Sequence, residues 1–521
     1  MKKTLLLLSL VTFVSKAFSQ LPEDVLRYSY WPQHGSARSM AIGGAMGSLG
    51  GDINALYVNP AGLGLYKTSE FVISPGFVNT MSKSTYRGTE GLQNSKSNFD
   101  LGTSGLVVSF NGAYSKLTSQ AFSIGVNQTA NFNNTISYKG TNNYSSYTEQ
   151  FAEQISKSGM SIDDILNDPR YAFGSAPALY TYLVDTFRNA QTHQLEVKGL
   201  PEFLLANNGS LVQEKTIQTK GGIYEIALGY AANTNDKFYW GIAMGIPIVS
   251  YDRYTYYKES DPSGNLHNNF DNFTLNDHVS TRGAGANFKL GVLYRPLAHW
   301  RFGVTVHTPT WYSLTDKQFS TLTANTEDYN GISSANSGLF PLYQPTGGNA
   351  QTKYTASTPW KALVSASYVF NEVSDTRKQR AFITADIEYI GYSGGRFGAD
   401  GDNTTDEDNA YYDGLKSVIK SYYKGAFNYR LGGELKFNTF MVRLGGSYYS
   451  NPYKDASLKS NIMQGSAGIG YRDHGIFIDL TYVYTFNKDV DFPYRLEDKA
   501  NTFATVNNTR SNVMLTFGIK L

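Results

Sequence analysis

Residues 35–66 read GSARSMAIGGAMGSLGGDINALYVNPAGLGLY, and this stretch indicates the fold more clearly than any other part of the chain. It consists almost wholly of small residues and shows no alternation of polar with apolar side chains. Small side chains bury little apolar area for each residue that is ordered, so the segment cannot build a core of its own. A neighbouring structure must therefore enclose it.

The residues before this stretch predict export. Lys2 and Lys3 form a positive n-region, residues 5–14 an apolar h-region, and Ala17-Phe18-Ser19 a small-residue cleavage site. The apolar run is about ten residues long, whereas a membrane-spanning helix needs roughly twenty. We therefore interpret residues 1–19 as a signal peptide.

The composition excludes several classes of protein. The net charge is +2 and becomes −1 when residues 1–19 are removed, which gives no electrostatic reason to bind nucleic acid. No other long apolar run exists, so a helical membrane protein is excluded. The absence of cysteine removes disulfide, zinc-thiolate and cysteine-nucleophile sites. The aromatic content of 14% suits a chain that lies at membrane interfaces, with a tyrosine-rich secreted β-sandwich as the alternative.

Strand-like runs with period-two alternation follow the small-residue stretch to the end of the chain. In residues 426–437, for example, Phe427 and Leu431 share one face while Arg430 and Glu434 share the other. We expect fourteen strands, at residues 69–80, 101–113, 121–138, 221–233, 238–256, 279–296, 300–318, 351–370, 380–397, 423–437, 440–452, 458–473, 476–491 and 505–521.

The gaps between these runs alternate between short and long, with the brief gap after residue 452 as the one exception. Bacterial outer-membrane barrels combine an even strand number with short periplasmic turns and long extracellular loops. We therefore predict an all-β fold, a 14-stranded antiparallel transmembrane β-barrel formed by residues 69–521. Residues 20–68 form a hatch in its lumen, and residues 139–220 a large extracellular insertion with some helix.

The small-residue stretch also resembles the N-terminal hatch of the FadL-type outer-membrane transporters of long-chain fatty acids and aromatic hydrocarbons. The resemblance rests on Ser36-Ala37-Arg38, Gly43-Gly44-Ala45, Asp52 and above all Asn59-Pro60-Ala61-Gly62. It implies a location in the outer membrane of a Gram-negative bacterium and passive uptake of hydrophobic molecules such as long-chain fatty acids. The ligand would bind in the lumen, and hatch movement would release it through a gap in the barrel wall. The sequence offers no Ser/His pairing for an outer-membrane lipase, so we expect no enzyme activity and no cofactor.

Several hatch and barrel residues have both a structural and a functional interpretation. Asn59 and Pro60 suit a capped turn that shapes the hatch, because Asn caps helical turns and Pro has a pre-set φ. By resemblance, the same motif lies at the bottom of the ligand site. Gly43 and Gly44 would permit either a static plug or a conformational switch. Gly125 marks residues 121–138 as a candidate place for a lateral opening.

Charged side chains are expected on the lumenal faces of the strands, namely Lys289, Asp386, Glu388, Arg430, Glu434, Lys436 and Arg443. A purely structural ion network is one interpretation, with Arg430 paired to Glu434. The alternative is that Lys289 and Arg430 anchor a ligand carboxylate through charge-assisted hydrogen bonds.

The long gaps contain two further patterns. Ser161 to Asp164 matches a capping box, and Leu179, Tyr182, Leu183 and Phe187 have helical spacing, which predicts a small helical cap or an apolar groove for ligand capture. Residues 400–408 are acidic but lack the glycine and glutamate of a calcium loop, so we interpret them as a solvated loop. No metal site and no catalytic residue is proposed.

Two other functions compete with uptake. Barrels of the same family serve type IX secretion as PorV-type shuttles, which would make the chain a protein-binding adaptor. A structural barrel or adhesin whose hatch never opens is the third possibility. For the uptake function the expected partners are a hydrophobic small molecule and outer-membrane lipid with lipopolysaccharide, and the expected state is a monomer.

Overall fold

An antiparallel sheet closes on itself in the computed structural model, which describes residues 22–110, 116–342, 345–346, 349–370, 380–400 and 404–521. The predicted signal peptide lies outside the described residues. Fourteen barrel strands form the wall, and those that are interrupted carry two labels. In chain order they are β1 (Glu70–Ile73) with β2 (Pro75–Tyr86), β4 (Asn94–Leu101) with β5 (Ser104–Phe110), β6 (Leu117–Asn131) with β7 (Asn134–Asn142), β10 (Leu211–Thr234), β11 (Phe238–Ser260), β12 (Asn272–Tyr294), β13 (Trp300–His307) with β14 (Trp311–Asn325), β16 (Ala350–Ser357) with β17 (Lys361–Phe370), β18 (Ala381–Gly391) with β19 (Arg396–Ala399), β20 (Gly425–Phe437), β21 (Phe440–Tyr449), β22 (Ile462–Asp473), β23 (Ile476–Asp491) and β24 (Ala504–Lys520).

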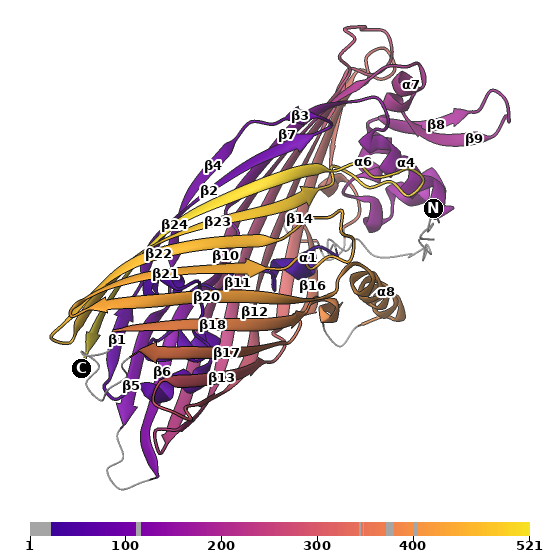
Figure 1. Cartoon of the computed structure of the whole chain (residues 1–521). Helices are drawn as coiled ribbons and strands as arrows, with labels where there is room; N and C mark the ends of the chain where they lie inside the picture. Colours follow the sequence, from indigo (N-terminus) through magenta and orange to yellow (C-terminus); the bar gives the residue numbers. More distant parts are fainter. Residues whose placement is uncertain (1–21, 111–115, 343–344, 347–348, 371–379, 401–403) are drawn as a thin grey trace, which may run out of the picture.

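The last strand closes the barrel against the first. β24 pairs with β1 through Phe71 and Ile519 and with β2 through Thr80 and Arg510. Figure 1 shows this closure as the yellow β24 lying beside the purple β2. The predicted all-β barrel of fourteen antiparallel strands is confirmed.

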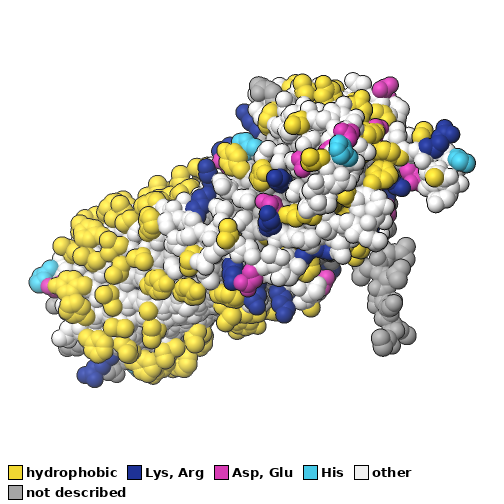
Figure 2. Space-filling model, turned by 90° about the horizontal axis from the view of Figure 1, so that it is seen from above, with side chains coloured by type: hydrophobic (Ala, Val, Ile, Leu, Met, Phe, Trp, Pro, Cys, Tyr) yellow, Lys and Arg dark blue, Asp and Glu magenta, His cyan; other side chains and the backbone are white. Residues whose placement is uncertain are grey.

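The outer surface of the wall is apolar over much of its length. Along β11 the side chains of Ile242, Met244 and Ile246 point outward, whereas Ala243 is buried against the interior. Figure 2 shows the resulting hydrophobic surface over the end of the barrel away from the helices. An apolar outer belt is typical of barrels that cross membranes. No helix in the described part of the chain is long and apolar enough to span one.

The two ends of the barrel differ in their connections. At the short-turn end, β20 and β21 are joined by Asn438-Thr439, and Asn438 has a φ of 51°. His474 and Gly475 also have positive φ, as the tight hairpin turns that match strand twist require. At the long-loop end, the connection after β21 runs from residue 450 to 461, because β22 begins at Ile462 rather than at 458. The apparent exception in the gap pattern therefore disappears.

The N-terminal residues fill the interior of the barrel, and we call residues 22–66 the plug. They form α1 (Asp24–Arg27), α2 (Ala37–Ala41), α3 (Ala55–Val58) and the 3-10 helix η1 (Pro60–Leu65), and most of their side chains are buried. The main chain of α2 bonds to the last strands of the wall. Ala37 N donates to Thr516 Oγ1 (2.8 Å), Thr481 Oγ1 donates to Ala37 O (2.6 Å), and Ser466 Oγ donates to Ala41 O (3.0 Å).

A cap of helices and a hairpin follows β7 at the long-loop end (Figure 1). It contains α4 (Tyr147–Ser158), α5 (Ile162–Leu166), η2 (Pro169–Tyr171), α6 (Ser175–Tyr180), the hairpin of β8 (Val184–Arg188) and β9 (Leu195–Gly199), and α7 (Leu200–Ala206). Ser161 caps α5 as predicted. The proposed second helical stripe is wrong beyond Leu179, because α6 ends at Tyr180, Tyr182 has a φ of 55° and Phe187 lies on β8.

The predicted acidic loop is in part a helix, α8 (Asp406–Tyr422). Thr405 Oγ1 accepts from Asp408 N (3.2 Å), and the acidic first turn suits the positive end of the helix dipole. Leu415 and Ile419 of α8 pack in one cluster with Val25 of the plug. The shorter elements β3 (Thr89–Glu90), β15 (Ile332–Asn336) and η3 (Ser337–Leu339) lie in the long connections, and η5 (Tyr392–Gly394) interrupts the wall strand between β18 and β19.

Candidate ligand-binding site

Asn59 fastens the second half of the plug to the wall. Its Oδ1 accepts from Ala61 N (3.1 Å), which caps η1, and its Nδ2 donates to Gly47 O (2.6 Å) and to Val292 O of β12 (3.2 Å). Pro60 is the first residue of η1, where a missing N–H costs nothing. A Cβ atom on Gly291 of β12 would lie 1.9 Å from Asn59 Oδ1. The wall is therefore shaped to receive this turn.

Gly43 and Gly44 form a left-handed turn after α2, with φ values of 66° and 77°. A Cβ atom on Gly43 would lie 2.6 Å from the carbonyl oxygen of Gly446 on β21. Both the backbone conformation and the close approach thus require glycine at Gly43. The predicted gating role of these two glycines stays a prediction.

Lys289 and Arg430, the predicted ligand anchors, are both buried in ion pairs. Lys289 Nζ bonds to Glu225 Oε1 and also donates to Asn287 Oδ1 (2.7 Å). Arg430 Nη2 lies 2.6 Å from Glu388 Oε1. Glu225, Glu388 and Arg430 border a cavity of about 140 Å³ beside plug residues 28–34. A cavity of this size has no room for a fatty acid chain, which favours the structural interpretation of both cations.

The expected pair of Arg430 with Glu434 is wrong. Four residues along a strand span roughly 13 Å, which is too far for an ion pair. Glu434 instead faces Arg443 across β20 and β21, with Oε2 2.6 Å from Arg443 Nε. Arg443 also reaches Asp479 on β23 (2.5 Å) and is fully buried. The lumenal charges are thus paired between strands rather than along them.

A much larger cavity of about 1260 Å³ lies toward the long-loop end. Its apolar lining includes Trp31 and Leu26 of the plug, Phe132 and Tyr251 of the wall, and Phe151 of the cap. Ordinary small-molecule sites measure roughly 300–1,000 Å³. This cavity is therefore large enough for a long apolar chain.

Two arginines that the sequence analysis overlooked border this large cavity. Arg510 of β24 donates to Asn131 O (3.1 Å) and lies 5.2 Å from the Trp31 ring centroid, and in the described part of the chain no ion pair joins it to a carboxylate. Arg253 of β11 lies 3.6 Å from Asp277, and its Nε has no acceptor among the described residues. Both occupy lumen-facing positions of predicted strands, so the alternation could have identified them.

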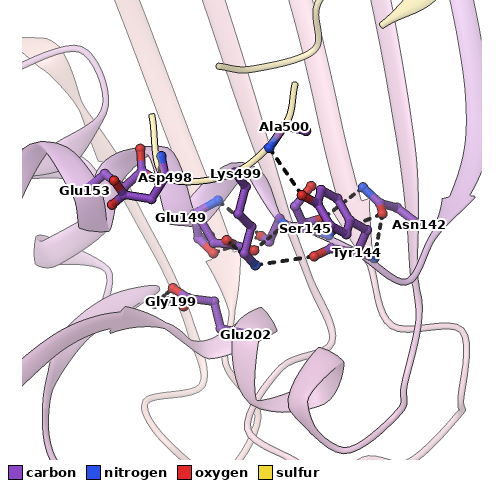
Figure 3. A network of polar contacts seen from close by, with 12 residues as sticks. Asn142, Tyr144, Ser145, Glu149, Glu153, Gly199, Glu202, Asp498, Lys499 and Ala500 are labelled. Atoms are coloured by element: carbon purple, nitrogen blue, oxygen red, sulfur yellow. Dashed lines mark hydrogen bonds and ion pairs between the residues drawn. The ribbon is translucent and has the colours of Figure 1, made fainter. Parts of the chain in front are cut away.

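The loop of residues 492–503, between β23 and β24, joins the cap above this cavity. Glu153 of α4 accepts from Glu497 N (2.8 Å) and Asp498 N (3.2 Å), and Lys499 Nζ lies 2.6 Å from Glu149 Oε2. Figure 3 shows these contacts between α4 and the loop. The loop also reaches the plug, because Arg495 pairs with Glu23. Cap, loop and plug are thereby connected at one place.

The wall has a gap in its ladder beside the same cavity. β4 pairs with β2 alone, β7 pairs with β10 alone, and β6 pairs with β5 only as far as Val126, within the described residues. We call the interface between β4 and residues 127–142 the seam. Side chains bridge it: Leu101 N donates to Gln128 Oε1 (3.2 Å) and Asn94 Nδ2 to Ser137 Oγ (2.6 Å).

The seam begins close to Gly125, which itself pairs with Gly105 on one side and Ala227 on the other. The break between β6 and β7 lies farther on, at Phe132 and Asn133. The predicted role of Gly125 in a lateral opening stays a prediction.

The fold has relatives among solved structures. A FadL homologue of Pseudomonas aeruginosa is 13% identical over 94% of this chain and 99% of its own, with a TM-score of 0.52. The toluene transporters TodX of P. putida and TbuX of Ralstonia pickettii are 14% and 13% identical, cover 94% of this chain and 99% of their own, and each has a TM-score of 0.49. No protein-family model and no curated protein matches the chain. The resemblance to the FadL-type fold is confirmed by the first of these structures.

Proposed function

We propose that this chain is an outer-membrane channel for the passive uptake of hydrophobic molecules such as long-chain fatty acids. The observation that carries the proposal is the position of the 1260 Å³ cavity, which is bordered by the cap, the plug and the seam at once. A ligand held there has the plug below it and the unpaired wall beside it. The fold that the chain shares with the solved FadL homologue is consistent with this proposal.

The cavity suits an amphipathic ligand. Its aromatic side chains offer apolar area to a hydrocarbon chain, and Arg510 and Arg253 can bind a carboxylate with charge-assisted hydrogen bonds. These two arginines replace Lys289 and Arg430 as our candidates, because Lys289 and Arg430 are held in short buried ion pairs beside the small cavity. Arg253 has a longer contact of 3.6 Å to Asp277, and its Nε has no acceptor among the described residues. Access from outside passes the contacts between α4 and the 492–503 loop.

Release would occur sideways through the seam. The plug closes the straight path along the barrel axis, whereas the seam has no backbone-to-backbone ladder among the described residues and would open by losing contacts made by side chains. Each such contact contributes only about 0.5–1.5 kcal/mol. Movement of the plug, which borders the cavity through Trp31 and His34, would couple ligand binding to this opening.

Bound lipid gives the direct test. Mass spectrometry of gently purified protein should detect co-purified fatty acid or hydrocarbon, and Arg510→Gln should weaken the binding of a fluorescent fatty acid about tenfold or more. Lys198→Gln, a change of the same charge on a half-buried residue of the β8–β9 hairpin outside the cavity lining, is the matched control. An empty lumen with a stoichiometric protein partner would instead support the PorV-type adaptor. An empty lumen without any partner would support a structural barrel.

Growth tests the same proposal in cells. Deletion of the gene should slow growth on oleate as carbon source, and the wild-type gene should restore it.

A further inference from the structure

His34 joins the plug to both edges of the seam. Its Nε2 lies 2.8 Å from Asp100 Oδ2 on β4, and its Nδ1 lies 3.0 Å from Asn127 Oδ1 on β6. β4 and β6 are the strands between which the backbone ladder is missing. The imidazole of His34 therefore bridges the two strands of the seam, between which no backbone ladder forms among the described residues.

The geometry also defines the protonation state of this ring. Asn127 Nδ2 donates to His34 O (3.2 Å), which orients the amide so that its oxygen faces His34 Nδ1. Asp100 is a carboxylate and can only accept at Nε2. Both ring nitrogens face acceptors, so both must carry a proton and the ring is an imidazolium.

The surroundings favour this charge. Burial lowers the pKa of His34, but the Asp100 carboxylate and the two hydrogen bonds outweigh that effect and raise the pKa above its ordinary value. Arg510 on β24 acts in the opposite direction, because its positive charge lowers the pKa of His34. The contact from β6 is the uncharged amide of Asn127. Asp100 is held in place by a further bond from Asn512 Nδ2.

We propose that His34 is the positioning residue that latches the seam, holding β4 to β6 through the plug. The inference rests on the proposed lateral release and identifies the contact that must break for it. Displacement of the plug withdraws the imidazolium from Asp100 and Asn127 together, so the two edges of the seam lose their shared partner in one step. Loss of the ring proton weakens the same latch, since neutral imidazole can donate to only one of the two acceptors.

Thiol reactivity at the seam tests the latch without any ligand. The chain contains no cysteine, so Gln128→Cys places a single reactive group at the seam. Thr384→Cys, on the buried lumenal face of β18, gives the reference rate that corrects for the pH dependence of the thiol itself. The assay is maleimide modification of the protein in lipid nanodiscs between pH 6 and pH 9, expressed as the ratio of the two rates.

If His34 latches the seam, the ratio of the Gln128→Cys rate to the Thr384→Cys rate should rise about tenfold or more between pH 6 and pH 9 when no other residue is changed. His34→Gln should give a high ratio at every pH, and His34→Arg, which keeps a charged donor, a low ratio at every pH. Asp100→Asn should shift the midpoint of the pH profile down by about one unit or more, because the opposite charge is lost. His193→Gln, on the exposed β8–β9 connection, should change nothing. Heat-modifiable migration in gels verifies that each variant has a folded barrel.

The idea is overturned if His34→Gln keeps the wild-type ratio and pH profile. Transfer of a fluorescent fatty acid into the surrounding lipid is measured separately. An opening seam without transfer would refute the uptake function and leave the latch intact. Transfer that is unaffected by His34→Gln, with an unchanged ratio, would refute the latch alone.

Discussion

Replacement of Asn59 by alanine should release the second half of the plug while the barrel stays folded. The change removes the cap of η1, which costs about 0.5–2 kcal/mol, and two bonds to carbonyl oxygens worth about 0.5–1.5 kcal/mol each. The total is about 1.5–5 kcal/mol of local stability. Because roughly 1.4 kcal/mol corresponds to a factor of ten, opening of the plug should become about 10 to 4,000 times more frequent.

Hydrogen exchange of the amides in residues 47–66 measures this opening. Asn59→Ser keeps a side-chain acceptor for Ala61 N but loses both donated bonds, so its effect should be smaller than that of Asn59→Ala. Asn409→Ala, on the exposed surface of α8, is the control and should leave the exchange unchanged. Exchange that rises less than threefold in Asn59→Ala would show that Asn59 does not hold the plug.

Three further outcomes are expected. Arg430→Met should lower the melting temperature, because the buried Glu388 carboxylate loses its short ion pair and keeps Lys361 at 3.7 Å and the Asn428 amide, at a cost of up to about 3–5 kcal/mol. Fatty acid binding in the large cavity should stay close to wild type, and thermal unfolding and a binding titration check both outcomes. Burial raises the pKa of Glu202 on α7 to about 7, so docking of α7 should lose stability as the pH rises from about 4.5 to 7. Glu202→Gln should remove this pH dependence, as measured by hydrogen exchange of residues 200–206. A pH dependence that persists in the variant would contradict the prediction. Glu153→Ala should speed proteolytic cleavage within residues 492–503, since two backbone N–H groups lose their acceptor, and unchanged cleavage would show that Glu153 does not fasten the loop.

The wall of the barrel was predictable because each strand separates two environments. Side chains such as Phe427 and Leu431 point outward from the wall, whereas Arg430 between them points into the interior. Apolar and polar residues therefore alternate with a period of two along the strand. The alternation of loop lengths then indicated which ends lie together. Strand ends at the long-loop end were predicted less well: β10 begins at Leu211 rather than at 221, whereas β22 begins at Ile462 rather than at 458.

The pairing of charges was not predictable from one strand at a time. Arg430 meets Glu388 because β18 and β20 pair in the register Asp386 with Arg430, and no local pattern encodes that register. The helix α8 was missed because its acidic start suggested a loop, although Thr405 and Asp408 have capping spacing. His34 lies before the small-residue stretch, and its role depends on two strands that approach it only in the closed barrel.

The contacts of α2 have a consequence for the order of assembly. Ala37 bonds to Thr516 and Thr481, and Ala41 to Ser466, at sequence separations of 479, 444 and 425 residues. The plug precedes the wall in the chain, yet the surface that holds α2 exists only when the last strands have paired. Contacts of such long range form late and slowly. The plug thus precedes the wall in the chain but can dock completely only at the end of barrel assembly, and a chain truncated before β22 would lack the partners that hold α2.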